Sequence, residues 1–420
     1  MPFDGGLART RAPVERAWKL RRCHGCRVTH DAELILAAGG LLAAGVAASL
    51  VATRLRVPAL VLFLGVGLAL GTDGLGWIGF DDYPFARLVG SIGLVLILYE
   101  GGLAAGLGEL RPVLRTAVSL ALVATLVTAV VAGLAAAALF DLSTKQGLLL
   151  GAILSATDGA AVFALMRGAR LPNRLARTLE GEAGFNDPVA VLLVLAMIKT
   201  IEHGSYGVGH AIWFFVREIA IGVGVGAGLG WLTGYTLARA ANAIPGALAL
   251  VASLATAAVA FGAAALAEGS GFLAVYVAGL TLGAARLRER PALLTFHEGL
   301  ASVAEIGLFL ALGLLVFPSQ LGDVAVKGIL LALVVALVAR PLAVAVATMR
   351  SGFSGRERVV LSWAGLRGAI PVVLATFAVI ADVPRGLHFF NIVFFAVLVS
   401  ALLQGSTVGW LARRLHVVRA

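Results

Sequence analysis

Long apolar runs alternate with short polar connections along almost the whole chain, from about residue 31 to residue 415. Each run is about 20 residues long, which is the length that an α-helix needs to cross the hydrocarbon core of a bilayer. The candidate spans are centred near residues 42, 66, 96, 126, 157, 188, 222, 255, 277, 309, 335, 369 and 402. This pattern predicts an all-α polytopic membrane protein with about 13 transmembrane helices.

The composition agrees with this fold class and excludes several functions. Hydrophobic residues make up 60% of the 420 residues and charged residues only 13%, against roughly 25% charged in an ordinary soluble protein. The connections are too short to hold a folded domain, and the chain has no GxxxxGK[ST] phosphate loop. We therefore exclude a primary pump within this chain, expect no cofactor, and expect any uphill transport to use an ion gradient.

The distribution of basic residues predicts the orientation of the chain. When alternate loops are assigned to alternate sides, one side collects eighteen arginines and the other only five basic residues. By the positive-inside rule the richer side is cytoplasmic, so the C-terminus is expected inside and the start of the first span outside. The net charge of +10 thus reflects topology and not nucleic-acid binding. The basic tail at residues 1–30 contradicts this orientation, and we give the loop count more weight.

Two predicted spans contain residues that favour a break in the helix. Span five carries Thr157 and Asp158 near its middle, and span twelve carries Gly365, Arg367 and Gly368, followed by a proline. Such residues compete with or loosen the helical backbone, and interrupted spans in the two halves of a transporter mark its binding site. Spans five and twelve are an odd number of spans apart, so they run in opposite directions, as in an inverted repeat.

Acidic residues lie in or at the edges of spans three, five and six. Each charge near the bilayer centre costs roughly 2.5–3.5 kcal/mol, so ionisable residues within spans indicate function. Asp158 lies beside the predicted break, and Asp187 in span six follows the amide of Asn186. Their oxygens suit a transported hard cation such as Na+ or K+. Glu100, near the end of span three, is a further candidate ligand.

The alternative interpretation is that these acids only pair with buried arginines and hold spans together. Arg340 in span eleven and Arg367 in span twelve are the available partners, and we expect Arg367 to pair with Glu182 of span six. That pair does not account for all the acids, so Asp187 and Asp158 remain the candidate transport site. If a proton and a cation compete for one buried carboxylate site, and the site can change its access from one side of the membrane to the other only when it is occupied, the protein must exchange one ion for the other.

Two other features have plainer interpretations. The glycines between residues 222 and 230 favour close helix packing and mark a candidate dimer contact. His297 and Glu298 are expected at the inner membrane interface beside span ten.

Three motifs, taken together, resemble a known family. They occur in the order and spacing of the bacterial NhaP and sodium–hydrogen-exchanger branch of monovalent cation–proton antiporters, and the resemblance extends from about residue 33 to 415. Further stretches look most like the cell-volume-regulating potassium–proton antiporters of that branch. The three motifs are Thr157-Asp158, Glu182-x-x-x-Asn186-Asp187-Pro188 and Gly365-Leu-Arg367-Gly-Ala-Ile-Pro371.

The resemblance implies a homodimer in the cell inner membrane. A core bundle of spans 4–6 and 11–13 would move against a dimerisation bundle of spans 1–3 and 7–10, within a transmembrane domain at residues 31–415 that is followed by a short cytoplasmic tail at 416–420. Asp187 would be the principal carboxylate for cation and proton, and Asp158 and Thr157 would lie where the two broken helices cross. Asn186 would orient the site, and a single Asn-Asp pair is similar to the electroneutral branch.

The leading prediction is a secondary active antiporter that exchanges K+ or Na+ for H+, and not an enzyme. The alternative is an uncoupled cation channel, which does not need Asp187 to titrate. The resemblance departs at Ala183, where relatives often have a serine, and after the last span, where potassium-type relatives usually carry regulatory domains. We expect that regulation to be missing or supplied by another chain. The choice between Na+ and K+ stays open, since it depends on cavity size.

Overall fold

The computed structural model describes residues 12–55, 57–80, 82–157, 171–202, 208–240 and 245–417. Within these ranges every regular element is helical, which confirms the predicted all-α class. Nine of the described helices are long and apolar enough to cross a membrane. Three shorter apolar helices accompany them in the same ranges. The chain is therefore a multi-pass membrane protein, while the count of thirteen spans remains a prediction.

The helices follow the predicted apolar runs. The first runs correspond to α1 (Ala12–Leu55), α2 (Ala59–Leu70) and α3 (Tyr83–Ala105), after which comes the short α4 (Leu107–Leu110). Helix α1 begins at Ala12, so it extends across the boundary at residue 30 that separates the basic tail from the first span in the sequence. The fourth run is α5 (Leu114–Ser119), a π-helical turn η1 (Leu120–Ala124) and α6 (Thr125–Phe140).

The remaining helices complete the two halves of the fold. The middle of the chain forms α7 (Thr144–Ser155), α9 (Asn173–Glu202), α10 (Val208–Arg239), α11 (Gly246–Leu266), α12 (Gly271–Gly283) and α13 (Arg290–Leu314). After a 3-10 turn η2 (Pro318–Gln320) come α14 (Gly322–Val334), the π turn η3 (Val335–Ala339) and α15 (Arg340–Ala347). The C-terminal part is α16 (Gly355–Trp363), α17 (Ala369–Ile380), α18 (Gly386–Val399), the π turn η4 (Ser400–Gly405) and α19 (Ser406–Arg414).

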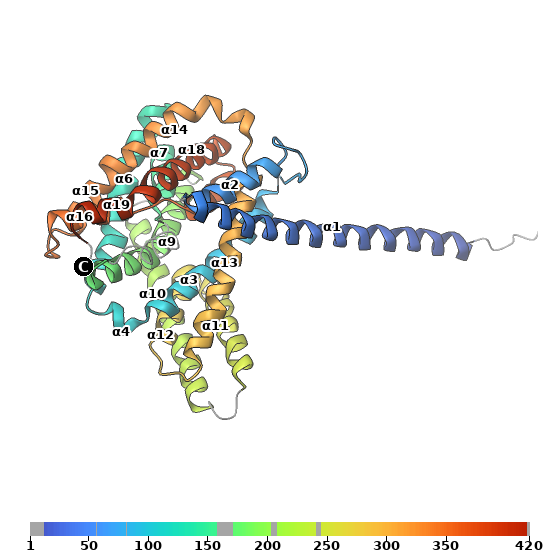
Figure 1. The fold of residues 1–420 in the computed structure, drawn as a ribbon, viewed down its shortest axis with the longest axis horizontal. Helices are drawn as coiled ribbons and strands as arrows, with labels where there is room; N and C mark the ends of the chain where they lie inside the picture. Colours follow the sequence, from blue (N-terminus) through green and yellow to red (C-terminus); the bar gives the residue numbers. More distant parts are fainter. Residues whose placement is uncertain are drawn as a thin grey trace, which may run out of the picture.

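The helices pack as two groups. Figure 1 shows α14 and α18 of one group in the upper part of the molecule and α11 and α12 of the other in the lower part. The first group, which we call the α6–α19 group, contains α5 to α7, α9 and α14 to α19. The second, the α1–α13 group, contains α1 to α3 and α10 to α13. Most contacts between the groups are made by α9 and α17 on one side and by α3, α12 and α13 on the other, and α2 also contacts η4. The predicted site residues of α9 therefore lie beside the boundary between the groups.

The glycines of α10 pack one helix against another within the chain. A Cβ added at Gly222, Gly226 or Gly230 would overlap backbone atoms of α12 or the residue that caps it, whereas Gly224 and Gly228 have open space beside them. Every fourth residue lies on one helical face, so one face of α10 meets α12 closely. Close packing is confirmed for this face, and it occurs within the chain.

Candidate functional site

Asn186 joins three helices in the interior of the molecule. Its side chain is fully buried, and its Oδ1 accepts a hydrogen bond from the backbone N–H of Thr157 at 2.8 Å. Helix α7 ends at Ser155 and the next residue is extended, so this N–H lies beyond the helix. The Asn186 amide donates to the Thr125 hydroxyl on α6, and it also lies 3.5 Å from the Ser155 carbonyl. A side chain of α9 therefore supports the non-helical backbone that follows α7.

Asp187 follows Asn186 on α9 and is only 4% exposed. The next residue, Pro188, lies inside the helix. Because proline has no N–H, the carbonyl one turn earlier, at Gly184, receives no helical hydrogen bond. The Asp187 carboxylate therefore lies in a buried stretch of α9 that lacks one helical backbone hydrogen bond.

Tyr276 approaches this stretch from the α1–α13 group. Its ring lies directly over Gly184, where an added Cβ would overlap the phenol, and it packs edge-on to Phe185 with ring centroids 5.0 Å apart. Tyr276 is buried, and its hydroxyl has no hydrogen-bond partner among the described residues. The sequence analysis did not single out this residue.

The structure describes the other predicted cation ligands only in part. Asp158 lies outside the described residues, so its pairing with Asp187 remains a prediction. Thr157 is buried at the end of the described part of span five. Glu100 is half-buried on α3, a helix that contacts α9. Within the described ranges no group of three His, Cys, Asp or Glu side chains could hold a metal ion, and that set does not include Asp158.

Glu182 forms a buried ion pair with Arg340, and both side chains are only 2% exposed. The prediction that Glu182 pairs with Arg367 is wrong. Gly365, which has no side chain, lies against the Arg340 guanidinium, where an added Cβ would overlap it. The absence of a side chain at this position lets Arg340 reach across to α9. Arg367 instead donates from Nη1 to the Gly365 carbonyl at 3.0 Å.

The predicted break in span twelve is confirmed between α16 and α17. Helix α16 ends at Trp363 and α17 begins after Gly368, its N-cap residue. The Arg367 backbone N–H donates to Ser400 Oγ at 2.8 Å, and that hydroxyl donates to Gln404 Oε1 at 2.7 Å. The Gln404 amide then donates to the Trp363 carbonyl at 3.2 Å. The π turn η4 therefore supplies the hydrogen bonds that the broken helix lacks.

Apart from Tyr276, the site residues that no sequence pattern predicted lie within or next to π-helical turns. Thr125 directly follows η1, and Ser400 and Gln404 lie within η4. Arg340, which was identified but given no partner, directly follows η3. Such turns are frequent at functional sites, but their sequences are ordinary apolar runs, so periodicity gives no signal for them.

His297 belongs to a buried polar cluster that joins three helices. It is fully buried on α13, and its Nε2 lies 2.9 Å from Ser253 Oγ, which in turn lies 3.1 Å from the Tyr99 hydroxyl. The three side chains connect α13, α11 and α3. Neighbouring helices therefore cover this face of α13, and the place of His297 at the inner membrane interface stays a prediction.

Comparison with known proteins places these features in a family. Residues 40–414 match the family described as sodium/hydrogen exchanger, transmembrane. The chain is 41% identical over 381 residues to the K(+)/H(+) antiporter NhaP2 of Shewanella sp. (strain ANA-3), which covers 89% of this chain and 66% of that protein. It is 40% identical over 387 residues to the K(+)/H(+) antiporter NhaP of Alkalimonas amylolytica, covering 91% of this chain and 67% of that protein.

Solved structures agree with this placement. The sodium proton antiporter MjNhaP1 from Methanocaldococcus jannaschii superposes with a TM-score of 0.79 at 27% identity, over 91% of this chain and 99% of that chain. By contrast, the chain spans about two thirds of the length of the curated relatives, 66% in the first case. The match over residues 40–414 covers all the site residues discussed above. The chain belongs to the sodium/hydrogen exchanger family of membrane transporters.

Proposed function

We propose that this protein is a secondary active antiporter that exchanges K+ or Na+ for H+. The observation that carries the proposal is Asp187, a buried carboxylate on a proline-interrupted stretch of α9, next to an asparagine that holds the unwound backbone of span five. The names of the relatives, K(+)/H(+) antiporter for NhaP2 and NhaP, favour the potassium ion. The sodium antiporter name of the structural relative keeps Na+ as the second candidate.

Exchange follows from competition at one carboxylate. A charge in the bilayer interior is costly, so the negative charge of the Asp187 carboxylate is neutralised either by binding a proton or by binding a cation. Asn186 is neutral and already uses its side chain on Thr157 and Thr125. Glu182 is neutralised by Arg340. Of these groups only Asp187 can change its charge with its occupant, and this supports one-for-one, electroneutral exchange, with Asp158 and Glu100 as further cation ligands.

The arrangement of the two helix groups supports an alternating-access mechanism. The α6–α19 group corresponds to the predicted core bundle and the α1–α13 group to the predicted dimerisation bundle. Asp187 lies on α9, at the boundary where the two groups meet. Sliding one group along this boundary gives the site access to each side in turn. We further propose a homodimer in the inner membrane, with the C-terminus cytoplasmic.

Cation-dependent proton movement in proteoliposomes tests the function. The full chain is reconstituted with a pH dye inside, an acid-inside gradient is set, and K+, Na+ and Li+ are titrated separately from pH 6 to pH 9. We expect alkalinisation of the lumen with K+ or Na+, and its loss in Asp187→Asn. The matched control is Asp382→Asn, which removes the charge of an exposed acid in a turn and should transport normally.

Two results would count against antiport. Proton movement that survives in Asp187→Asn would remove this residue from the site. Cation flux without any coupled proton movement, measured as current across a planar bilayer, would instead favour the uncoupled channel.

A further inference from the structure

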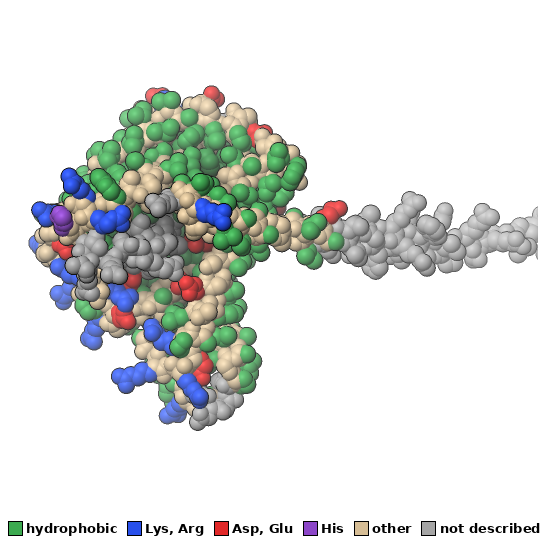
Figure 2. Space-filling view, viewed as in Figure 1, with side chains coloured by type: hydrophobic (Ala, Val, Ile, Leu, Met, Phe, Trp, Pro, Cys, Tyr) green, Lys and Arg blue, Asp and Glu red, His purple; other side chains and the backbone are tan. Residues whose placement is uncertain are grey.

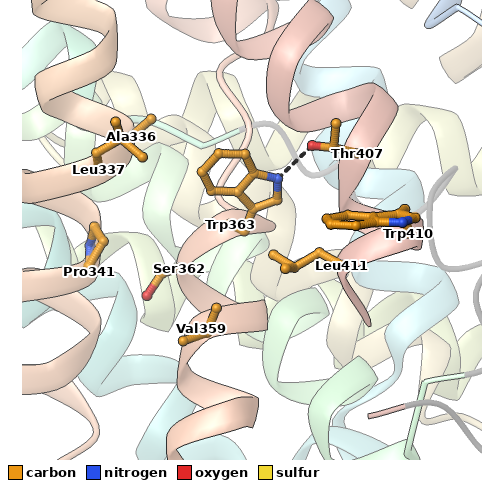
Figure 3. A pocket seen from close by; sticks show the side chains of 9 residues that line it. All are labelled: Ala336, Leu337, Pro341, Val359, Ser362, Trp363, Thr407, Trp410 and Leu411. Carbon is orange, nitrogen blue, oxygen red and sulfur yellow. Dashed lines mark hydrogen bonds between the residues drawn. The ribbon is translucent and has the colours of Figure 1, made fainter. Parts of the chain in front are cut away.

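An apolar groove opens on the surface of the α6–α19 group, away from Asp187. It has a volume of about 440 Å³ and is enclosed by η3 with the start of α15, by α16 and by α19 (Figure 3). Its walls are almost entirely apolar. A hydrogen bond of 2.8 Å from Trp363 Nε1 to Thr407 Oγ1 ties α16 to α19 across the groove. The residues that matter here are Leu337, Pro341, Val359, Trp363, Trp410 and Leu411.

A second, polar cavity continues the groove along the same two helices. It has a volume of about 700 Å³ and is lined by the start of α16, including Arg356, and by the residues after α19, including Leu415 and His416. Arg356 is three residues from Val359, and Leu415 is four residues from Leu411, so each pair shares one helical face. The apolar groove and the polar cavity therefore follow one another along a single surface.

The polar end of this surface is positively charged. Arg356 and Arg414 are exposed, and neither forms an ion pair within the described ranges. Glu357, which lines the same cavity, already accepts hydrogen bonds from the Ser354 backbone and hydroxyl, each at 2.8 Å. Figure 2 shows Lys and Arg side chains gathered at the edge of the molecule where Figure 1 places α16, α19 and the C-terminal end. An anion bound at this position could therefore pair with the guanidinium groups of these two arginines.

We propose that this surface binds an anionic phospholipid of the surrounding bilayer, with an acyl chain in the apolar groove and the headgroup against Arg356 and Arg414. From Thr407 to Leu415 the surface extends by about 12 Å at 1.5 Å per residue, which fits within one leaflet of a hydrocarbon core about 30 Å thick. Trp410, 59% exposed beside the groove, is the type of side chain that concentrates at membrane interfaces. Basic residues at that level attract anionic headgroups.

The position of the groove connects the lipid to the broken span. Helix α16 leads directly into the break, and its last residue, Trp363, both lines the groove and accepts the hydrogen bond from Gln404. Thr407 lies just after η4, the turn that supports Arg367. A bound lipid therefore holds together the two helices that support the unwound backbone.

Lipid binding to the delipidated, purified full chain tests the proposal independently of transport. Phosphatidylglycerol and phosphatidylcholine with identical acyl chains are added separately in detergent. The number of bound lipid molecules is measured by native mass spectrometry, and the melting temperature of each sample is measured in parallel. One variant, Arg356→Gln with Arg414→Gln, removes the charges. A second, Val359→Phe, fills the groove from an exposed position. The matched control is Arg286→Gln with Arg288→Gln, two exposed arginines before α13.

We expect phosphatidylglycerol to bind and to raise the melting temperature of the wild type and of the control. The charge variant should lose about tenfold or more in affinity for it, and Val359→Phe should lose the bound lipid. Unchanged phosphatidylglycerol binding in both variants, or equal binding of phosphatidylcholine to the wild type, would overturn the proposal. A change of oligomeric mass in Val359→Phe would also overturn it and would assign the groove to a contact between copies of the chain.

Discussion

At the scale of single residues, Asn186 acts as a substitute for a helical backbone partner. Its carbonyl oxygen accepts the Thr157 N–H and its amide contacts Thr125 and the Ser155 carbonyl. Buried backbone groups left without a partner are costly, and in a bilayer they cannot turn to water. Asn186 therefore has a structural role that does not depend on the proposed transport role of Asp187.

Asn186→Ala should lower the stability of the protein. The change leaves the Thr157 N–H buried without its acceptor, at a cost of about 1–3 kcal/mol. Thermal unfolding in detergent measures this as a lower melting temperature. Asn173→Ala, at the exposed start of the same helix, is the control and should melt like the wild type; equal melting of all three proteins would refute the role given to Asn186.

The choice of partner for Glu182 leads to a second residue-scale prediction. Removing one member of a buried ion pair leaves an uncompensated charge and costs about 3–5 kcal/mol. We expect this loss in Arg340→Met and in Glu182→Gln, with part of it recovered in the double variant. A double-mutant cycle on unfolding free energy should therefore give strong coupling between Glu182 and Arg340. Stronger coupling between Glu182 and Arg367 would contradict the observed pair.

At the scale of elements, residues in or beside the π-helical turns interact with neighbouring helices, including the break in span twelve. Ser400 and Gln404 of η4 form the hydrogen bonds that the broken span twelve lacks. Arg340, the partner of Glu182 in the buried ion pair, is the residue directly after η3. Ser119, the residue directly before η1, donates through Oγ to the Ala347 carbonyl of α15 at 2.8 Å. Irregular backbone in one span is thus satisfied by a neighbouring span.

The spacing of glycines along α10 allows a direct test of helix packing. Gly226→Ala places a methyl group against the Ala274 carbonyl of α12, and overpacking of this kind costs about 1–3 kcal/mol. Gly224→Ala adds the same methyl group where nothing lies within 4 Å, and it should be neutral or slightly stabilising because alanine favours helix. Melting temperatures of the two variants should therefore separate, and identical values would contradict the packing.

A surface connection between elements should respond to pH. Asp73, after α2, accepts hydrogen bonds from the backbone N–H of Ser319 at 3.1 Å and from its hydroxyl. These bonds lower the pKa of the Asp73 carboxyl from its usual value of 3.8. The folded form is therefore stabilised above that pH, and the stabilisation is lost as the pH falls through the lowered pKa. The melting difference between wild type and Asp73→Asn should be present at neutral pH and vanish in acid.

At the scale of the whole molecule, the site lies where two groups of helices meet. If transport requires them to move past each other, a covalent bond across the boundary must stop it. A Cβ at Gly90 of α3 lies 3.6 Å from that of Val373 on α17, and one at Gly93 lies 3.8 Å from that of Ala304 on α13. Both separations suit a disulfide, but only the first joins the two groups.

Gly90→Cys with Val373→Cys should therefore abolish transport when oxidised and recover it on reduction. Gly93→Cys with Ala304→Cys, which bridges helices of one group, should transport in both states. Both pairs are made in a background with Cys23 and Cys26 replaced by serine, and crosslinking is checked by mass. Full transport by the oxidised Gly90–Val373 pair would show that the groups need not move.

The amino-acid sequence alone determined the fold class, the positions of the helices, the break in span twelve and the family. Each of these depends on local properties of the sequence. An apolar run has a favourable free energy of transfer into lipid, and residues such as Gly365 and Gly368 interrupt a helix. The tertiary structure decided that Glu182 pairs with Arg340, that Asn186 supports the Thr157 backbone, and that Tyr276 reaches the stretch before Asp187. Those outcomes depend on distances between helices far apart in the chain, and packing alone sets such distances.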